Sequence, residues 1–382
     1  MRKTYKIPLE EQIKLASKLS NRDDAEAKRI KHYLSMPDLS RTPRSPIYEI
    51  VERVLNSSDF KDLDIIETPE IVPANISFDL FDFPIDHPAR SKSDTYYVDS
   101  ENILRTHTTV MWYYYLEEPE IKARMARNEP VGCFSYGKVY RKDEIDRHHM
   151  NVFHQIDGWY LAPKDKESIG QPELEKVLTT IARAAFSDEV EGRFNPDKFP
   201  YTDPSIEMEI NKNDKWIEVL GSGVVKGSVL EKFGVDSSKW NGWAFGTGIE
   251  RLAIVSMELP DIRLLWSEDE RVKKQLNLGQ KYKEVSKFPP VVRDISFIVG
   301  ENFILNDYFD AIRTVGGDLI EEVELLDKYE NKEKFGEGKT SYTFRITYRH
   351  LDRTLTNQEV NELHAKIEEM TKKDYEGVIR VV

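Results

Sequence analysis

The stretch GKVYRKDEIDRHHMNVFHQIDGWYL, residues 137–161, places a dense run of charged residues and histidines between two apolar, strand-like segments. Successive residues of a strand point to opposite faces, so Phe153 and Gln155 would share one face of the second strand, while Arg141 ends the first. A nucleotide on that face would meet a cation at its phosphate and an aromatic ring at its base. The pattern predicts a strand, a charged loop and a returning strand that bind a nucleotide. A solvated hairpin is the alternative.

The histidines of this stretch, His148, His149 and His154, raise the question of a zinc site. The sequence contains no His-Glu-x-x-His helix, and the segment has the pattern of a loop followed by a strand. We therefore interpret them as histidines that make ordinary hydrogen bonds.

A second motif, GTGIER at residues 246–251, is expected to open a helix on its glycines. It lacks the third glycine of a dinucleotide fingerprint and the lysine of a phosphate-binding loop. Gly246 and Gly248 would instead allow a ligand to approach the backbone. Arg251 would direct its guanidinium at a polyphosphate or stack on a base.

The first 45 residues have the pattern of a helical extension and a linker. Apolar residues recur at helical spacing over residues 8–34, and the proline-containing segment MPDLSRTPRSPIYEI follows. Ser45 before Pro46 is a helix-start signal. The next domain is expected to begin at residue 46.

Residues 46–282 contain more strand patterns than helix patterns, and the strand patterns come in neighbouring pairs. Strands are expected at 94–99, 137–141, 152–162, 206–210 and 215–225, and helices at 173–187 and 246–258. This order favours an antiparallel sheet flanked by helices over a parallel sheet. The fold class is therefore α+β.

Residues 283–382 show the order β-α-β-β-α-β, which is typical of a ferredoxin-like domain. The expected elements are 291–299, 303–315, 319–328, 340–348, 356–373 and 377–382. A charged segment, YENKEKFGEGK, would form the central hairpin loop.

Composition excludes several classes of protein. The chain has 382 residues, a formal net charge of −13 and one cysteine, Cys133. This charge argues against a non-specific nucleic-acid coat, although residues 345–353 form a local basic patch. One cysteine cannot build a disulfide framework, no apolar run is long enough to span a membrane, and the first residues resemble no secretory signal or transit peptide. These features predict a cytoplasmic protein without a membrane partner.

The motifs resemble those of class II phenylalanyl-tRNA synthetases. Residues 137–158 are similar to the family's motif 2, and GWAFGTGIERLAI with LPDIRLLW is similar to its motif 3. HPARSKSDTYYV, LRTHTT, KFPYTDPSIEMEI and KWIEVLGSGV match further family segments in the same order. The segment from KFPPVVRDISFIV onward resembles the ferredoxin-like anticodon-binding domain. The fusion of both parts is similar to the single-chain mitochondrial form.

The resemblance implies a role in ATP binding for five residues of the two motifs. Arg141 would bind the amino-acid carboxylate and the α-phosphate, and His148 and His149 would lie beside the outer phosphates. Phe153 would stack on adenine and Arg251 would cover its other face. Arg141 and Arg251 would be the catalytic residues.

The resemblance also implies a magnesium ion. Glu218, in WIEVLG, corresponds to the acid that holds magnesium or ATP, and Asp203, in FPYTDP, is a second magnesium candidate. Each acid taken alone has the pattern of a surface carboxylate.

The amino-acid pocket implied by the resemblance has a polar side and a slot for a ring. The polar side would contain His107, Thr109, Asp143, Gln155 and Asp157. The slot would be walled by Phe199, Tyr201 and Phe245, with Ala244 at its floor. Aromatic walls suit an aromatic ligand.

Four positions depart from the family's usual residues. Thr109, Trp112, Asp157 and Tyr201 stand where serine, glutamine, glutamate and phenylalanine are common. We expect the Tyr201 hydroxyl to pair with Asp157, so that the pocket still takes phenylalanine. A class II synthetase for another amino acid, or an inactive synthetase-like binding protein, is the alternative.

The implied activity is ATP-dependent attachment of phenylalanine to tRNA(Phe) through an aminoacyl-adenylate. Arg345, Arg349 and Arg353 are candidate tRNA contacts in the second domain. The single-chain layout implies a monomer without a separate β subunit, and no segment has the size of an editing domain.

Overall fold

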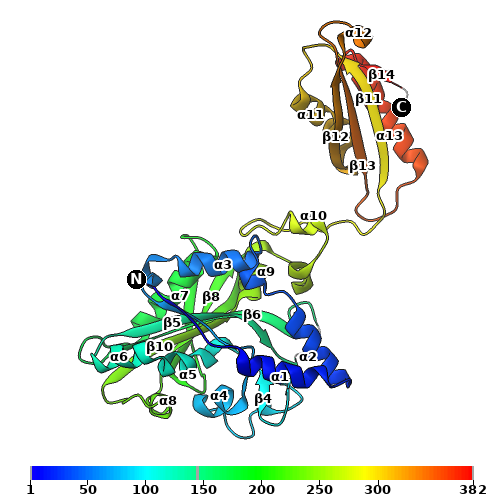
Figure 1. The fold of residues 1–382 in the computed structure, drawn as a ribbon. Coiled ribbons are helices and arrows are strands. Elements are labelled where there is room, and N and C mark those ends of the chain that lie inside the picture. Colours follow the sequence, from blue (N-terminus) through cyan, green and yellow to red (C-terminus); the bar gives the residue numbers. More distant parts are fainter. Residues whose placement is uncertain (1, 143–145, 381–382) are drawn as a thin grey trace. The chain divides into compact units, whose positions relative to one another are not determined.

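The computed structural model describes residues 2–142 and 146–380, and the chain forms two compact units, residues 1–282 and 283–382 (Figure 1). None of the described helices combines the length and apolar character needed to cross a bilayer.

The first unit is built on an eight-stranded sheet. In spatial order its strands are β1 (Thr4–Lys6), β2 (Asp64–Glu67), β5 (Val131–Tyr140), β6 (Val152–Pro163), β10 (Trp240–Gly248), β9 (Lys215–Val225), β8 (Thr202–Lys212) and β7 (Gly192–Asp197). From β5 to β7 every pairing is antiparallel, as predicted. The pairs β1–β2 and β2–β5 are parallel, so the whole sheet is mixed.

Three helices cover one side of this sheet: α3 (Pro46–Leu55), α7 (Gln171–Ala185) and α9 (Ile249–Met257) (Figure 1). The side chain of Ser45 accepts a hydrogen bond from the backbone of Ile47, which confirms the predicted start of α3. Ile47, Ile50 and Val54 of α3 are fully buried. Burying such a side chain contributes about 1.5–3 kcal/mol, so this apolar stripe fixes α3 against the unit.

The N-terminal extension is two helices and not one, α1 (Glu10–Ser20) and α2 (Ala25–Ser35). The chain breaks between them, and Asp24 caps α2 by accepting a hydrogen bond from the backbone of Ala27. Leu19 of α1 and Ile30 of α2 are buried in one core cluster with Tyr140 of β5. The extension is therefore part of the first unit.

The remaining elements of this unit are short. They include β3 (Ile71–Pro73), β4 (Asn102–Leu104), α4 (Ala74–Phe78), α5 (Met111–Glu117), α6 (Pro119–Ala126), α8 (Gly227–Lys232) and α10 (Glu270–Lys273). The predicted strand at 94–99 is wrong: only an isolated bridge joins Tyr97 to Ile103. Asp99 accepts hydrogen bonds from the backbone of Glu101 and Asn102, so the chain turns directly after this segment. The backbone hydrogen bonds that flank the bridge, from Val98 to Asn102 and from Leu104 to Tyr96, do not continue into a ladder.

The second unit confirms the predicted β-α-β-β-α-β order. Its elements are β11 (Val291–Val299), α11 (Leu305–Gly316), β12 (Ile320–Glu330), α12 (Lys332–Phe335), β13 (Thr340–Tyr348), α13 (Asn357–Asp374) and β14 (Val378–Arg380). The antiparallel sheet has the order β12-β13-β11-β14, and Phe297, Phe344 and Ile367 lie at the centre of its core. This is a ferredoxin-like fold.

Candidate active site

A cavity of about 390 Å³ opens on the sheet of the first unit. It brings together most of the residues that the sequence predicted for the site. Those residues are His107, Thr109, Arg141, Gln155, Asp157, Phe199, Tyr201, Glu218, Ala244, Phe245 and Arg251. They come from β5, β6, β9, β10, α9 and the loops before β8 and α5, so the sheet is what assembles the site.

Asp157 is the buried acid of the cavity, with 2% of its surface exposed. Its Oδ2 accepts a hydrogen bond of 2.6 Å from the hydroxyl of Thr109. The predicted pairing of Asp157 with Tyr201 is therefore wrong: Thr109 supplies the donor. Burial raises the pKa of Asp157 to about 6, although Thr109 and the positive charge of Arg141 favour the ionised form.

Gly246 makes room for this carboxylate. The predicted helix 246–258 starts only at Ile249, because Gly246 and Gly248 complete β10. Gly246 lies opposite Asp157 in the ladder, and a Cβ atom there would lie 2.7 Å from Asp157 Oδ1. Gly246 thus makes room in the pocket, whereas Gly248, the N-cap of α9, is the glycine that opens the helix.

His107 is held in one orientation on the same side of the cavity. Its Nε2–H donates to the carbonyl of Ser77 at 3.0 Å, because a carbonyl only accepts. Burial, helped by the nearby charge of Arg141, lowers the pKa of His107 to about 4. The ring is neutral at physiological pH, and Nδ1 is left as an acceptor.

Three buried polar atoms of this region have no hydrogen-bond partner among the described residues. They are His107 Nδ1, Gln155 Oε1 and Asp157 Oδ1. Buried polar atoms are nearly always paired, so an unpaired group of acceptors in a cavity indicates a ligand that donates hydrogen bonds. An ammonium group is such a ligand.

The ring slot is formed by aromatic residues, as predicted. Phe199 and Tyr201 lie nearly parallel with ring centres 6.4 Å apart, and Phe245 and Ala244 line the same cavity. Gly221 allows the ring of Phe199 to lie against the backbone, since a Cβ atom there would approach Phe199 Cζ to 2.7 Å. A flat apolar side chain can pack against these aromatic walls.

Trp112 does not line this cavity. It is fully buried, stacks on Trp159 with ring centres 4.7 Å apart, and meets Tyr201 edge-on at 6.0 Å. Trp112, at a position where glutamine is common in the family, therefore packs behind Tyr201, one wall of the slot.

Arg141 and Arg251 supply the cations of the cavity. The Nε–H of Arg141 donates to the carbonyl of Thr106 at 3.0 Å, and its guanidinium lies 5.2 Å from the ring centre of Phe153. Arg251 Nη1 lies 3.6 Å from Glu218 Oε1, and both side chains are about half exposed. Phe153 itself is half-buried beside the cavity and does not line it.

A neighbouring groove of about 740 Å³ shares Glu218 and Arg251 with the cavity and contains His148 and His149. Asp146 orders both histidines by accepting hydrogen bonds from their backbone N–H groups. The structure therefore places the two histidines beside the two residues predicted to contact ATP.

The acids predicted to hold magnesium separate in space. Glu218 lines the cavity and the groove, whereas Asp203 is exposed and lines neither. Asp143 lies outside the described residues. Within residues 2–142 and 146–380 no cluster of three metal-binding side chains occurs, so a metal here would depend on Glu218 and on ligand atoms from its substrate.

One lining residue that the sequence analysis did not identify is Phe83. Its ring lies parallel to that of His107 at 6.1 Å and closes that side of the cavity. It lies in a segment without helical or strand periodicity, so the local sequence carries no signal for its position.

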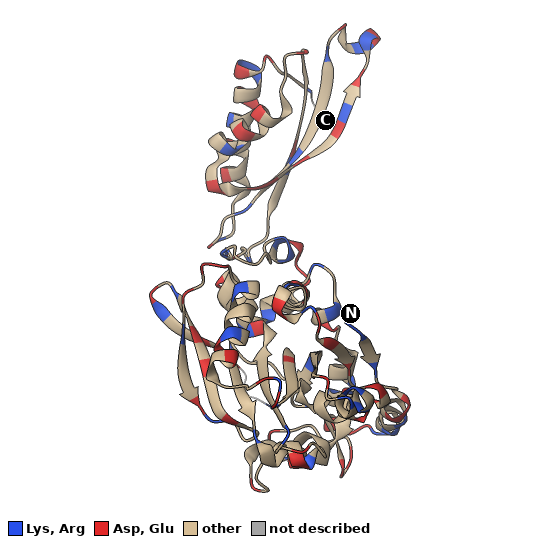
Figure 2. Ribbon diagram, turned by 90° about the vertical axis from the view of Figure 1, so that its left-hand side faces the viewer, with Lys and Arg blue, Asp and Glu red and all other residues tan. Residues whose placement is uncertain are grey.

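The three candidate tRNA contacts are all engaged within the second unit. Arg345 pairs with Asp294 at 2.9 Å, Arg349 with Glu321 at 2.9 Å, and Arg353 with Glu359 at 2.7 Å. Acidic and basic residues are interspersed over this unit (Figure 2). Arg349 is only 13% exposed, whereas Arg345 and Arg353 are about half exposed.

Comparison with known proteins agrees with this geometry. The family model for tRNA synthetases class II core domain (F) matches residues 32–276, and the ferredoxin-fold anticodon binding domain matches residues 286–380. The sheet, its cavity and these matches define a class II aminoacyl-tRNA synthetase.

Similar proteins show to which family of class II synthetases the chain belongs. The chloroplastic/mitochondrial phenylalanine–tRNA ligase of Arabidopsis thaliana is 40% identical over 314 residues, 79% of this chain and 70% of that protein. The mitochondrial enzyme of Mus musculus is 38% identical over 79% of this chain and 72% of its own, and that of Saccharomyces cerevisiae is 30% identical over 88% and 87%. The chain belongs to the phenylalanine–tRNA ligases, in their single-chain, mitochondrial-type form.

The same relatives correct the prediction of a cytoplasmic protein. Their names place them in mitochondria, or in chloroplasts and mitochondria. An organellar location is therefore supported. A low cysteine count does not distinguish one reducing compartment from another, which is why composition led to the wrong compartment.

Proposed function

We propose that this chain activates phenylalanine with ATP and transfers it to tRNA(Phe). The observation that carries the proposal is a cavity lined by an aromatic slot, a buried acid and two arginines. An amino acid with an aromatic side chain and a nucleotide triphosphate match these three features.

Phenylalanine would bind with its ring packed against the aromatic walls formed by Phe199, Tyr201 and Phe245. Its ammonium group would donate to the unpaired acceptors of Asp157, Gln155 and His107, and the ionised Asp157 would balance its charge. Its carboxylate would then face Arg141, whose forked donors suit a carboxylate and a phosphate together.

In the activation step a carboxylate oxygen of phenylalanine attacks the α-phosphorus of ATP. A phosphorus–oxygen bond to the β-phosphate breaks, and pyrophosphate leaves with the electron pair, giving the aminoacyl-adenylate. The chain contributes position and charge: Arg141 stabilises the developing negative charge, and Arg251, released from Glu218, contacts the nucleotide beside Phe153. Asp157 holds the ammonium group and carries no proton to the reacting atoms.

We propose that magnesium binds through Glu218. Magnesium is usually held by one or two carboxylates together with substrate phosphates, and Glu218, an exposed carboxylate in the groove proposed to take ATP, fits this pattern. The ion would neutralise phosphate charge during activation.

In the second step a terminal ribose hydroxyl of the tRNA attacks the carbonyl carbon of the adenylate, and AMP leaves. The ferredoxin-like unit would bind the anticodon, and Arg345 and Arg353 have the exposure that a phosphate contact needs. We propose that the protein needs no β subunit, in keeping with its single-chain relatives, and that it acts as a monomer.

The test is a charging assay with purified protein. We expect ATP–pyrophosphate exchange that depends on phenylalanine, and formation of phenylalanyl-tRNA with tRNA(Phe). Tyrosine and leucine serve as competing amino acids. Exchange that follows another amino acid, or no exchange with any, would contradict the proposal.

Tyr201→Phe is expected to change kcat/KM for phenylalanine by less than about threefold, because Thr109 and not Tyr201 donates to Asp157. Exchange kinetics with phenylalanine and with tyrosine provide the measurement. Thr109→Val is the comparison and should lose more, since it removes the donor itself. A larger loss in Tyr201→Phe than in Thr109→Val would show that the tyrosine hydroxyl supports the acid.

A further inference from the structure

A buried contact joins β6 to α9 at the point where the ladder between β6 and β10 ends. The pairing of β6 with β10 stops at Gln155 and Gly248, because the chain turns into α9 at Ile249. Beyond this point the carboxylate of Glu250 accepts the backbone N–H of His154, with Oε2 at 2.8 Å and Oε1 at 2.9 Å from the nitrogen. His154 Nδ1 lies 2.6 Å from Glu250 Oε1 and donates to it, because a carboxylate only accepts.

This contact lies out of water. His154 is 0% exposed and Glu250 is 2% exposed. A hydrogen bond to a charged acceptor is strong in such a place, and leaving the carboxylate without a donor is costly. The relation between this point of the strand and the first turn of the helix is therefore rigid.

The sequence neighbours of this pair are nucleotide-site residues. Phe153 precedes His154 and points to the opposite face of β6, and Arg251 follows Glu250. The ring proposed to lie under the adenine and the guanidinium proposed to cover it are thus carried by residues adjacent to one buried contact.

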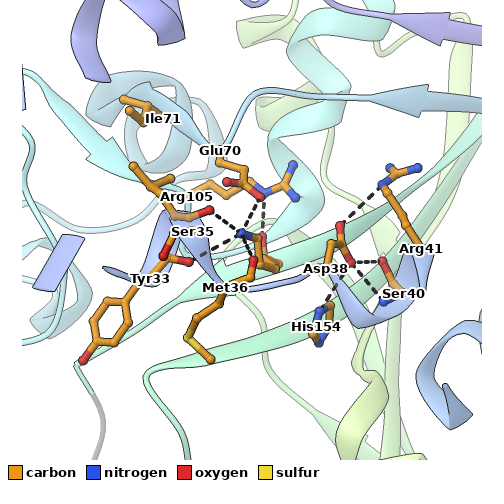
Figure 3. Close-up of polar contacts among 12 residues, drawn as sticks. Tyr33, Ser35, Met36, Asp38, Ser40, Arg41, Glu70, Ile71, Arg105 and His154 are labelled. Atoms are coloured by element: carbon orange, nitrogen blue, oxygen red, sulfur yellow. Dashed lines mark hydrogen bonds and ion pairs between the residues drawn. The ribbon is translucent and has the colours of Figure 1, made fainter. Parts of the chain in front are cut away.

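The opposite edge of the His154 ring is closed by the linker after α2. The backbone N–H of Leu39 donates to His154 Nε2 at 2.9 Å. Asp38 Oδ1 lies 3.3 Å from the same nitrogen (Figure 3). Trp266 stacks on the ring at 5.5 Å. The imidazole is held on three sides and has one available orientation.

Lys138 attaches the same linker to the neighbouring strand. It lies opposite His154 in the β5–β6 ladder and is 3% exposed. Its ammonium donates to the carbonyls of Leu34 at 2.9 Å and Met36 at 2.8 Å, at the C-terminal end of α2, where a cation is favoured. Two adjacent sheet residues therefore bind the segment from Leu34 to Leu39.

We propose that His154 is a positioning residue for ATP, acting through Glu250, and that the linker residue Leu39, which donates to the other ring nitrogen, completes its support. His154 touches no substrate. It fixes the distance between Phe153 and Arg251, so that both faces of the adenine site are formed before the nucleotide arrives. The role given to these two neighbours rests on the proposed function.

The test measures ATP binding to the full-length protein by calorimetry, without amino acid or tRNA. His154→Leu keeps the side-chain volume but removes both ring nitrogens, and we expect the Kd for ATP to rise about tenfold, the size of one lost hydrogen bond to a charged group. The Kd for phenylalanine should change less than about twofold by the same scale, because Asp157 and Thr109 keep their contact. His154→Asn places an amide donor where Nδ1 stood and should recover most of the ATP affinity.

A matched control separates positioning from general stability. Tyr115→Phe removes a buried hydrogen bond to Asp64 at 2.7 Å elsewhere in the same unit. It should lower Tm without changing the Kd for ATP. An unchanged Kd in His154→Leu, or an equal rise in Tyr115→Phe, would overturn the proposal. So would a His154→Asn variant as weak as His154→Leu.

A second variant covers the case in which His154→Leu does not fold. Glu250→Gln has the same shape and loses only the charge and one acceptor, and it is expected to weaken ATP binding in the same direction. A Glu250→Gln protein that binds ATP like the wild type would overturn the proposal. If the wild-type protein bound ATP but charged no tRNA, the proposed function would be refuted. The role of His154 would still be decided by the Kd for ATP of its variants.

Discussion

Replacing Arg141 by alanine is expected to lower kcat/KM for phenylalanine activation about 10²–10³-fold, the loss typical of removing one preorganised donor from a developing oxyanion. The carbonyl of Thr106 fixes the Nε end of the side chain, so the guanidinium is already aimed into the cavity before substrates bind. The loss should appear in kcat as well as in KM, because the charge on the α-phosphate grows during attack. Pyrophosphate exchange at varied ATP and phenylalanine concentrations provides the measurement.

Two variants frame this prediction. Arg141→Lys keeps the charge but not the fork, and it should recover only part of the activity. Arg127→Ala removes an exposed arginine whose partner is Glu129, in the same unit but outside the cavity and the two motifs, and it should leave exchange unchanged. If the Arg141→Ala enzyme kept a kcat/KM within about tenfold of the wild-type value, the reacting phosphate would have to lie elsewhere.

The parts of the fold that the sequence predicted well are those with strong local periodicity. The strands of residues 137–161 alternate clearly, and the β-α-β-β-α-β order of the second unit can be counted along the chain. The three-residue strand β1 was missed because it has too few residues to show a period. Its parallel pairing with β2 depends on residues some 60 positions away, and it makes the sheet mixed.

The site was predictable to the extent that it follows sequence motifs. Motif resemblance identified the cavity residues, since the sheet brings those motifs together. It could not show that Gly246 is a strand residue making room for Asp157. The sequence around a glycine does not reveal whether that glycine precedes a helix or lies beside a carboxylate. Nor could it show the bond between His154 and Glu250, which are 96 residues apart. Such contacts exist only once the ladder is assembled.

Asp157→Asn is expected to raise the KM for phenylalanine about 10²-fold or more, because it leaves the substrate ammonium in a buried site without its counter-charge. The free enzyme should also show a matching pH dependence. Burial raises the pKa of Asp157 to about 6, so the KM of the wild type should rise about tenfold for each pH unit below 6 and be constant above 7. His107, with a pKa of about 4, does not titrate in this range. In Asp157→Asn the KM should be independent of pH between 5 and 8.

The stability of the free enzyme should also depend on the protonation of Asp157. Folding favours the protonated carboxyl, whereas phenylalanine binding favours the ionised form. The folded chain binds the Asp157 proton more tightly than the unfolded chain does, where the pKa is 3.8. The contribution of this group to the free energy of unfolding is therefore present below pH about 4 and is lost as the pH rises through 6. Asp157→Asn removes that loss, so the variant should gain stability relative to the wild type above pH 6 while binding phenylalanine more weakly. A variant that is less stable at pH 7 and equally tight for phenylalanine would mean that the carboxylate supports the fold through Thr109 and does not hold the substrate. Denaturant midpoints at pH 5 and pH 7.5, together with the KM at each pH, separate the two roles.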